Sequence, residues 1–202
     1  MEHQPPHVPL LPTVMANGFS PIPLPLWPFL NRLRKRGCDI TVVSFRLEDM
    51  RNVETFGEHI RDAVIEAAER SPTGRVNLVG LSMGGVAALH AIKRLGIAHL
   101  VDTFVAVGSP FHGSKYSWFA LPTIAFTRTG RQLLPRSSYL YKLRKERMPT
   151  GIRTVTIAGK MDDICPQKTA LLEKSEQVVA DFSHHEIFRT PEVQDLFISF
   201  CH

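Results

Sequence analysis

The chain lacks the features that mark membrane-spanning, exported and disulfide-rich proteins. No apolar run approaches the ~20 residues that a membrane-spanning helix requires. Residues 1–10 carry prolines and histidines in place of a basic segment followed by an apolar one. Three cysteines, Cys38, Cys165 and Cys201, are an odd number with no CxxC pair and no His/Cys spacing of a zinc site. These absences predict a cytoplasmic protein with reduced thiols and no metal.

The sequence also lacks disordered or low-complexity stretches and any nucleic-acid-binding motif. Its 202 residues are 44% hydrophobic, so we expect residues 1–202 to form a single domain around one core. There are 24 Lys and Arg against 19 Asp and Glu, a formal charge of +5, but no motif for nucleic acid accompanies it. Basic residues gather at 32–36 and 128–147, which leaves open a solvated surface or an attraction to anionic membrane lipids or acidic partners.

Short runs rich in β-branched residues alternate with longer segments of helical spacing, the pattern of parallel strands joined by crossover helices. Expected strands lie at 14–16, 40–45, 76–79, 104–107, 154–158 and 177–180. Expected helices lie at about 26–36, behind an Asn52 cap through residues 56–67, after Ser82 to about 95, and at 192–200. The pattern predicts an α/β fold with about six parallel strands flanked by helices.

A long insertion, about residues 111–150, interrupts this alternation after the fourth strand. It is aromatic, basic and broken by prolines. Long irregular insertions are often functional. We expect a short cap over the edge of the sheet, with Trp118 and Phe119 among its apolar side chains.

The candidate chemistry begins with Gly80-Leu81-Ser82-Met83-Gly84, which matches the G-x-S-x-G nucleophile elbow between an apolar strand and an Ala-rich helix. A serine becomes nucleophilic only when a base takes its proton, and the base needs an acid to orient it. Two acidic residues, Asp162 and Asp163, follow the fifth expected strand, and two histidines, His184 and His185, follow the sixth.

Several motifs together resemble the α/β-hydrolase superfamily, and within it the small lipase and esterase group, over nearly the whole chain. Residues 159–166 (GKMDDICP) resemble its G-x-x-D-x-[IV]-V-P run, with Cys165 in place of valine. Residues 183–187 (SHHEI) resemble its G-H-x-x-[IL] segment, with serine in place of glycine. The resemblance implies Asp162 as the acid and His184 as the base, with Asp163 and His185 as the alternatives.

The same resemblance covers the oxyanion hole and the cap. The backbone N–H of Met83, the residue after the nucleophile, is one expected donor. Residues 17–19 (NGF) resemble a His-Gly-Phe segment, which implies the N–H of Phe19 as the second donor. Residues 108–114 (GSPFHGS) resemble the segment that enters a lipase cap, and 135–140 (PRSSYL) imply that Tyr139 and Leu140 line its inner face.

These motifs predict a serine carboxylic-ester hydrolase acting through Ser82, His184 and Asp162. The apolar cap, including Trp118, Phe119, Tyr139 and Leu140, favours apolar or lipid-like esters as substrates. No metal or organic cofactor is implied. An acyltransferase or thioesterase with the same three residues remains open, as does a catalytically silent lipid-binding module.

Overall fold

The computed structural model describes residues 10–18, 27–114, 126–187, 189 and 191–200. Its centre is a six-stranded sheet in the order β2-β1-β3-β4-β5-β6, and each neighbouring pair is parallel. The strands are β1 (Thr13–Ala16), β2 (Ile40–Val43), β3 (Val76–Leu81), β4 (Val101–Val107), β5 (Arg153–Gly159) and β6 (Glu176–Ala180). The predicted α/β class and parallel sheet are confirmed.

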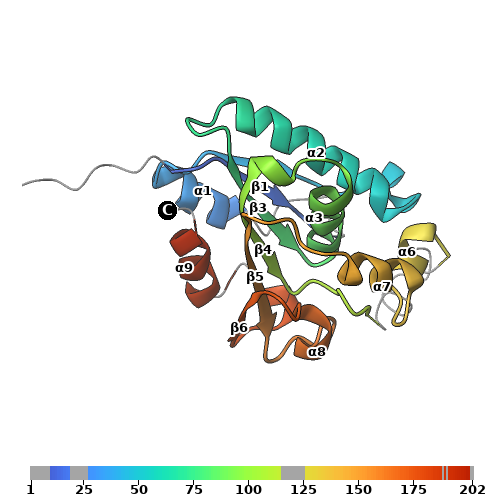
Figure 1. The fold of residues 1–202 in the computed structure, drawn as a ribbon. Helices are drawn as coiled ribbons and strands as arrows, with labels where there is room; N and C mark the ends of the chain where they lie inside the picture. Colours follow the sequence, from blue (N-terminus) through green and yellow to red (C-terminus); the bar gives the residue numbers. More distant parts are fainter. Residues whose placement is uncertain (1–9, 19–26, 115–125, 188, 190, 201–202) are drawn as a thin grey trace, which may run out of the picture.

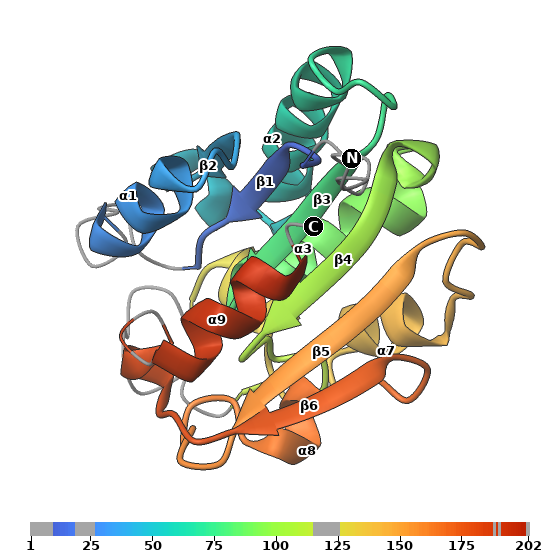
Figure 2. The same cartoon turned by 90° about the vertical axis from the view of Figure 1, so that its left-hand side faces the viewer.

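Helices cover both faces of this sheet. The α-helices are α1 (Trp27–Lys35), α2 (Val53–Glu69), α3 (Met83–Arg94), α6 (Arg128–Gln132), α7 (Ser138–Lys145), α8 (Gln167–Ala170) and α9 (Pro191–Phe200). Short 3-10 turns are η2 (Leu47–Met50), η3 (Ala98–Leu100) and η4 (His184–Glu186). Helices α2 and α3 lie on one face, and α1 and α9 lie on the other (Figures 1 and 2). None of the helices in the described ranges is long and apolar enough to cross a membrane.

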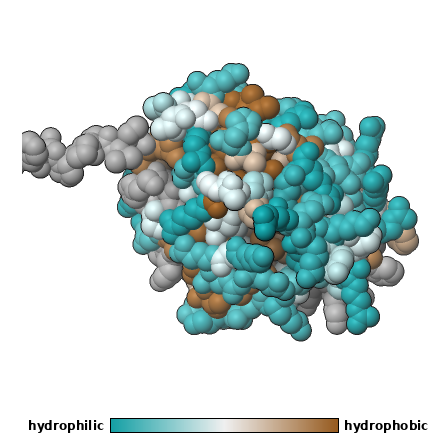
Figure 3. All heavy atoms as spheres, in the orientation of Figure 1, coloured by the Kyte–Doolittle hydropathy of each residue, from teal (hydrophilic) through white to brown (hydrophobic). Residues whose placement is uncertain are grey.

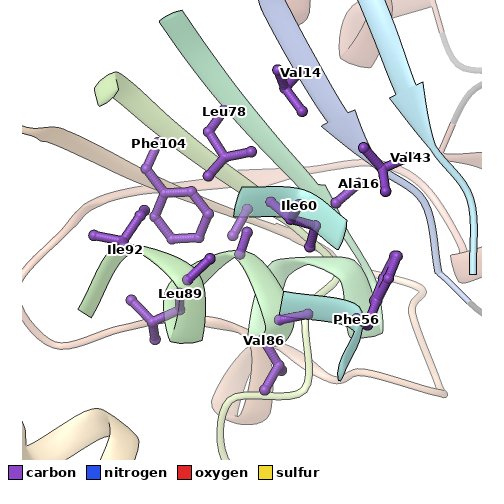
Figure 4. Close-up of a cluster of buried hydrophobic side chains, with 14 of the residues drawn as sticks. Val14, Ala16, Val43, Phe56, Ile60, Leu78, Val86, Leu89, Ile92 and Phe104 are labelled. Carbon is purple, nitrogen blue, oxygen red and sulfur yellow. The ribbon is translucent and has the colours of Figure 1, made fainter. Parts of the chain in front are cut away.

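The side chains of successive strand residues pack alternately against the two helix layers, because they point to opposite faces of the sheet. Val14 and Ala16 of β1 belong to the cluster that packs against α2 and α3, whereas Met15 belongs to the cluster with α1. Figure 4 shows the first cluster, in which Leu78 and Phe104 of the strands face the helix layer. Burial of both faces of the inner strands β1 and β3 explains why they read as nearly continuous apolar runs rather than as alternating ones.

Several element boundaries differ slightly from the sequence expectation. Strand β4 begins at Val101, three residues before the expected 104. The polar residues Asp102 and Thr103 concealed this start in the sequence, but Val101 and Thr103 pair with Val76 and Asn77 of β3, with a register shift between the two pairs. Strand β2 ends at Val43, two residues before the expected end. The expected cap at Asn52 is confirmed, since its side chain accepts a hydrogen bond from the Thr55 N–H at 2.8 Å.

The insertion after β4 contains α6 and α7, and both are attached to the layer formed by α2 and α3 (Figure 1). The Thr129 hydroxyl of α6 donates to the Asp49 carbonyl of η2 at 2.6 Å. The Lys93 ammonium of α3 donates to the Leu143 carbonyl of α7 at 2.8 Å. The part of the insertion at 115–125 lies outside the described residues. The described part therefore extends one helix layer of the domain.

Candidate active site

Ser82 occupies a strained turn between β3 and α3. Its φ of 51° and ψ of −126° lie outside the favoured regions for a residue with a side chain, and α3 begins at the next residue, Met83. Such a turn projects the serine from the carboxyl edge of the sheet, where strand β3 ends. The local geometry is therefore that of a nucleophile elbow.

The two glycines that flank Ser82 are required by close backbone packing. A Cβ atom on Gly80 would lie 2.3 Å from the Gly85 Cα, and one on Gly84 would lie 2.2 Å from the Ala16 carbonyl oxygen. These neighbours are backbone atoms that cannot rotate away. The G-x-S-x-G spacing thus follows from the approach of α3 to strands β1 and β3.

His184 lies beside Ser82 although the two residues are 102 positions apart. It begins η4, just after β6, and its Nε2 is 3.1 Å from the Ser82 Oγ. Its Nδ1 is 2.8 Å from the Asp162 Oδ2. Because a carboxylate only accepts hydrogen bonds, Nδ1 carries the proton and Nε2 is free to accept from the Ser82 hydroxyl. The three side chains therefore form one continuous hydrogen-bonded chain.

The carboxylate of Asp162 is held from several sides in the turn that follows β5. Its side chain is fully buried, and Oδ1 accepts a hydrogen bond from the Cys165 N–H at 2.7 Å. Gly108, at a φ of +53°, lies against the pair, since a Cβ there would be 3.0 Å from Oδ2 and 3.4 Å from the His184 Nδ1. With both oxygens engaged, Asp162 is fixed in an orientation that holds the imidazole.

The two members of each candidate pair, Asp162 and Asp163 or His184 and His185, lie in different surroundings. Asp162 and His184 face each other, whereas Asp163 and His185 are exposed. The His185 ring lies edge-on to that of His184, with centroids 6.3 Å apart. The first member of each pair is therefore the one that contacts its counterpart.

A capping box that the sequence analysis did not use holds the loop of His184. The Ser183 N–H and hydroxyl both donate to the Glu186 carboxylate, at 3.1 Å and 2.6 Å, and the Glu186 N–H closes the turn by donating to the Ser183 carbonyl at 2.9 Å. The hydrogen bonds from Ser183 hold the pKa of Glu186 below its ordinary value. The S-x-x-E spacing at 183–186 is the sequence signal that identifies this box. This box gives a structural reason for serine at position 183, where the resembled segment has glycine.

The segment before Phe19 contacts the nucleophile directly. The Asn17 side chain accepts a hydrogen bond from the Gly18 N–H at 3.0 Å, and the Asn17 N–H donates to the Val43 carbonyl at 2.9 Å. A Cβ on Gly18 would lie 2.9 Å from the Ser82 Cβ. Asn17 thus anchors this loop where the resembled segment has histidine. Phe19 itself lies outside the described residues, and the two oxyanion donors stay predictions.

The four expected substrate contacts fall into two groups. Trp118 and Phe119 lie outside the described residues. Tyr139 and Leu140 belong to α7 and pack toward α3, where the Tyr139 hydroxyl is 3.0 Å from the Nδ1 of buried His90 and Leu140 joins the buried apolar cluster. Their described contacts are those of a packed interior, and a role for them in substrate binding stays a prediction.

Cys165 brings a thiol to the same corner of the sheet. It is buried, and both burial and the neighbouring Asp162 raise the pKa of the thiol well above its ordinary value, so the sulfur is protonated at neutral pH. One potential ligand atom from each of Asp162, Cys165 and His184 lies within 4.8 Å of the other two. Among the described residues, this is the group whose donor set fits a metal ion.

The doubly wound parallel sheet and the strained serine at the end of β3 define the α/β-hydrolase class of proteins. A family model described as an alpha/beta hydrolase of unknown function (DUF915) matches residues 32–170, more than half of the chain. The chain belongs to this family. No curated protein sequence matches it.

Solved structures with the same architecture include several lipases. Mature lipase BlEst2 from Bacillus licheniformis is similar over 99% of this chain and 94% of that one, with a TM-score of 0.80 and 17% identity. Lipase B from Aspergillus fumigatus matches 94% of this chain and 51% of that one, with a TM-score of 0.72 and 17% identity. The lin2722 product of Listeria innocua matches 95% of this chain and 94% of that one, with a TM-score of 0.65 and 13% identity. At these identities the similarity shows a shared fold.

Proposed function

We propose that this protein is a serine carboxylic-ester hydrolase. One observation carries the proposal: the Ser82 hydroxyl, the His184 imidazole and the buried Asp162 carboxylate form a hydrogen-bonded chain with separations of 3.1 Å and 2.8 Å. This is the arrangement in which a base can take the serine proton while an acid holds its tautomer and stabilises its charged form.

The reaction follows from the direction of these hydrogen bonds. His184 Nε2 takes the proton of Ser82 as Oγ attacks the ester carbonyl, and the developing oxyanion is stabilised by the backbone N–H groups of Met83 and Phe19. The imidazolium then returns the proton to the leaving alcohol, which leaves an acyl group on Ser82. Water, activated in turn by Nε2, releases the acid. No step requires a cofactor.

We further propose lipid-like esters as the substrate class and an anionic lipid surface as their source. Support comes from an exposed corner, here called the η2–α6 surface, formed by Arg46, Leu47, Arg51, Phe126, Arg128 and Arg131. Leu47 is 82% exposed and Phe126 is 84% exposed, although both are large apolar residues. Elements η2 and α6 are joined by the hydrogen bond from Thr129 to Asp49.

The position of this surface suits delivery of a lipid to Ser82. Element η2 follows strand β2 at the carboxyl edge of the parallel sheet, the edge at which Ser82 follows β3. The four arginines outnumber the two acidic residues that pair with them, Glu48 with Arg46 and Glu54 with Arg128. Each basic residue near an anionic membrane contributes about 1 kcal/mol at most. Figure 3 shows a largely hydrophilic exterior on the side that carries α6 and α7, so binding would combine charge with a few inserted side chains.

Covalent labelling by a fluorophosphonate probe tests the reaction class. We expect the parent chain to be labelled once and Ser82→Ala to lose labelling while it retains its fold by circular dichroism. Ser138→Ala, at an exposed serine of α7, is the matched control and should label like the parent. Labelling that survives in Ser82→Ala would refute the nucleophile.

A series of p-nitrophenyl esters of increasing acyl length then tests the substrate class. Turnover that rises with chain length supports lipid-like esters. Labelling of Ser82 without hydrolysis, but with acyl transfer to an added alcohol or thiol, would identify an acyltransferase. Preference for thioesters over the matched oxygen esters would identify a thioesterase instead.

A further inference from the structure

We infer that Asp162, Cys165 and His184 form a Zn²⁺ site that switches off the Ser82 nucleophile. The three side chains offer one carboxylate oxygen, one sulfur and one imidazole nitrogen, all within 4.8 Å of one another. Zinc bonds of about 2.0–2.3 Å place the ligands of a tetrahedral site roughly 3.4 Å apart. The His184 Nδ1 and the Asp162 Oδ2, now 2.8 Å apart, must therefore separate slightly to admit the ion, while the Cys165 sulfur, within 4.8 Å of both, moves to the same distance from it.

The local backbone already holds two of these ligands together. The Cys165 N–H donates to the Asp162 Oδ1 at 2.7 Å, which closes the turn from the acid to the cysteine and keeps the thiol beside the carboxylate. The third ligand is equally near, because the His184 Nδ1 faces Asp162 Oδ2 at 2.8 Å. The buried thiol and carboxylate belong to the turn after β5, while the partly exposed imidazole gives the ion its path from solvent.

The donor set selects the metal. A thiolate, an imidazole and one carboxylate suit Zn²⁺, whereas Mg²⁺ and Ca²⁺ require oxygen ligands. Three protein ligands leave a fourth position for water, as in zinc sites that are not fully closed. Coordination displaces the thiol proton of Cys165 to solvent, and the Nδ1 proton of His184 is replaced by the metal while Nε2 becomes protonated. The net release is one proton.

This tautomer change explains why zinc would inhibit. A His184 ring that carries its proton on Nε2 faces the Ser82 Oγ with a donor, so it cannot accept the serine proton. Asp162 is occupied by the metal at the same time. The inhibition rests on the proposed function, but zinc binding itself does not, since it is measured on the resting protein.

The binding test uses the full chain in a phosphine reductant, titrated with Zn²⁺ against a chromophoric chelator, and with Co²⁺ as a spectroscopic substitute. We expect one tight site per chain and a thiolate-to-cobalt absorption band. Cys165→Val, which keeps the backbone N–H that holds Asp162, should lose roughly 100-fold or more in zinc affinity and lose the band, because removal of a ligand costs at least as much as loss of an outer-shell partner.

Two controls separate this site from adventitious binding, because the chain contains nine histidines. Cys38→Val removes a buried thiol in the cluster with α1, and His185→Ala removes the exposed neighbour of the proposed ligand. Both should bind zinc like the parent. Unchanged affinity in Cys165→Val, or loss of the band in Cys38→Val, would overturn the site.

The inhibitory consequence is read from the rate of fluorophosphonate labelling of Ser82. Zinc should slow labelling of the parent, a chelator should restore it, and the ratio of rates with and without zinc should approach one in Cys165→Val. Tight zinc binding that leaves the labelling rate of the parent unchanged would overturn the switch. Absence of ester hydrolysis, with the zinc site intact, would instead refute the proposed reaction.

Discussion

The Tyr139 hydroxyl and the His90 Nδ1 lie 3.0 Å apart and join α7 of the insertion to α3, the helix that begins immediately after Ser82. Their rings are stacked, and the Arg94 guanidinium lies 5.6 Å from the centre of the Tyr139 ring while it binds Glu146 at 2.6 Å. Helix α3, which directly follows the candidate nucleophile, and the described part of the insertion are therefore one packed unit.

Removal of this hydroxyl should destabilise the domain. Tyr139→Phe leaves the buried His90 nitrogen without its partner, and an unsatisfied buried polar group costs about 1–3 kcal/mol. Urea unfolding measures the loss. Tyr141→Phe, at an exposed tyrosine of the same helix, should change the unfolding free energy by less than about 0.5 kcal/mol. Equal effects in the two variants would contradict the role of the pair.

The same histidine should make stability depend on pH. Burial, followed by the charge of Arg94, lowers the pKa of His90 below its usual 6.5, and the smaller effects of Glu54, Glu58 and Glu146 oppose this. As pH falls, His90 is therefore protonated in the unfolded chain before it is protonated in the folded chain. The free energy of unfolding decreases as pH falls below the pKa of His90 in the unfolded chain. Between about pH 7.5 and about pH 5.5, the parent should lose more unfolding free energy than His90→Gln. A slope that is the same in both would exclude His90 as the cause.

The paired residues of the candidate site should respond unequally to substitution. We expect His184→Ala and Asp162→Asn to reduce ester turnover by roughly 10⁴. His185→Ala and Asp163→Asn should reduce it little, because both side chains are exposed. Steady-state kinetics on one p-nitrophenyl ester measures all four. A reversed order within either pair would move the role to the neighbouring residue and leave the reaction class intact.

Gly18 should be required for reactivity at Ser82. A methyl group there meets the Ser82 Cβ at 2.9 Å and the Leu81 carbonyl at 3.2 Å, so Gly18→Ala displaces the serine or the loop beside it. We expect a fall of about tenfold or more in the labelling rate, since misplacement by about 1 Å can cost 10²-fold. Gly74→Ala adds a methyl group into open space at a φ of +70°, so it strains the backbone without touching Ser82 and, as the control, should label like the parent. Parent-like labelling of Gly18→Ala would show that the loop yields without consequence.

The η2–α6 surface should determine binding to anionic vesicles. Replacement of both Leu47 and Phe126 by serine removes two apolar side chains, each worth up to about 1.5–3 kcal/mol when fully buried. Co-sedimentation should show weaker binding by about tenfold or more, and binding of the parent should weaken as salt is added. Ile65→Ser removes an exposed apolar residue of α2 and should bind like the parent. Absence of binding by the parent itself would remove the proposed membrane contact and favour a dispersed ester substrate.

Local sequence determined the elements and the chemistry that they carry. A β-branched run followed by G-x-S-x-G and an Ala-rich helix specifies a strand, a strained turn and a helix, because steric limits on backbone and side chain act over a few residues. The same local reasoning identified the acidic pair after β5 and the histidine pair after β6 as candidates. It placed the start of β4 too late, because Asp102 and Thr103 are polar. Pairing with β3 determines where this strand begins.

Only the tertiary structure decided which members of those pairs meet and what surrounds them. The order β2-β1-β3-β4-β5-β6 places the ends of β3, β5 and β6 at one edge, so that His184 reaches both Ser82 and Asp162. Asp163 and His185, the other members of the two pairs, are exposed. The tertiary structure also brings the Cys165 thiol to the acid and turns Tyr139 toward His90. Contacts between residues tens of positions apart depend on strand order and helix packing, and no local pattern of residues encodes those distances.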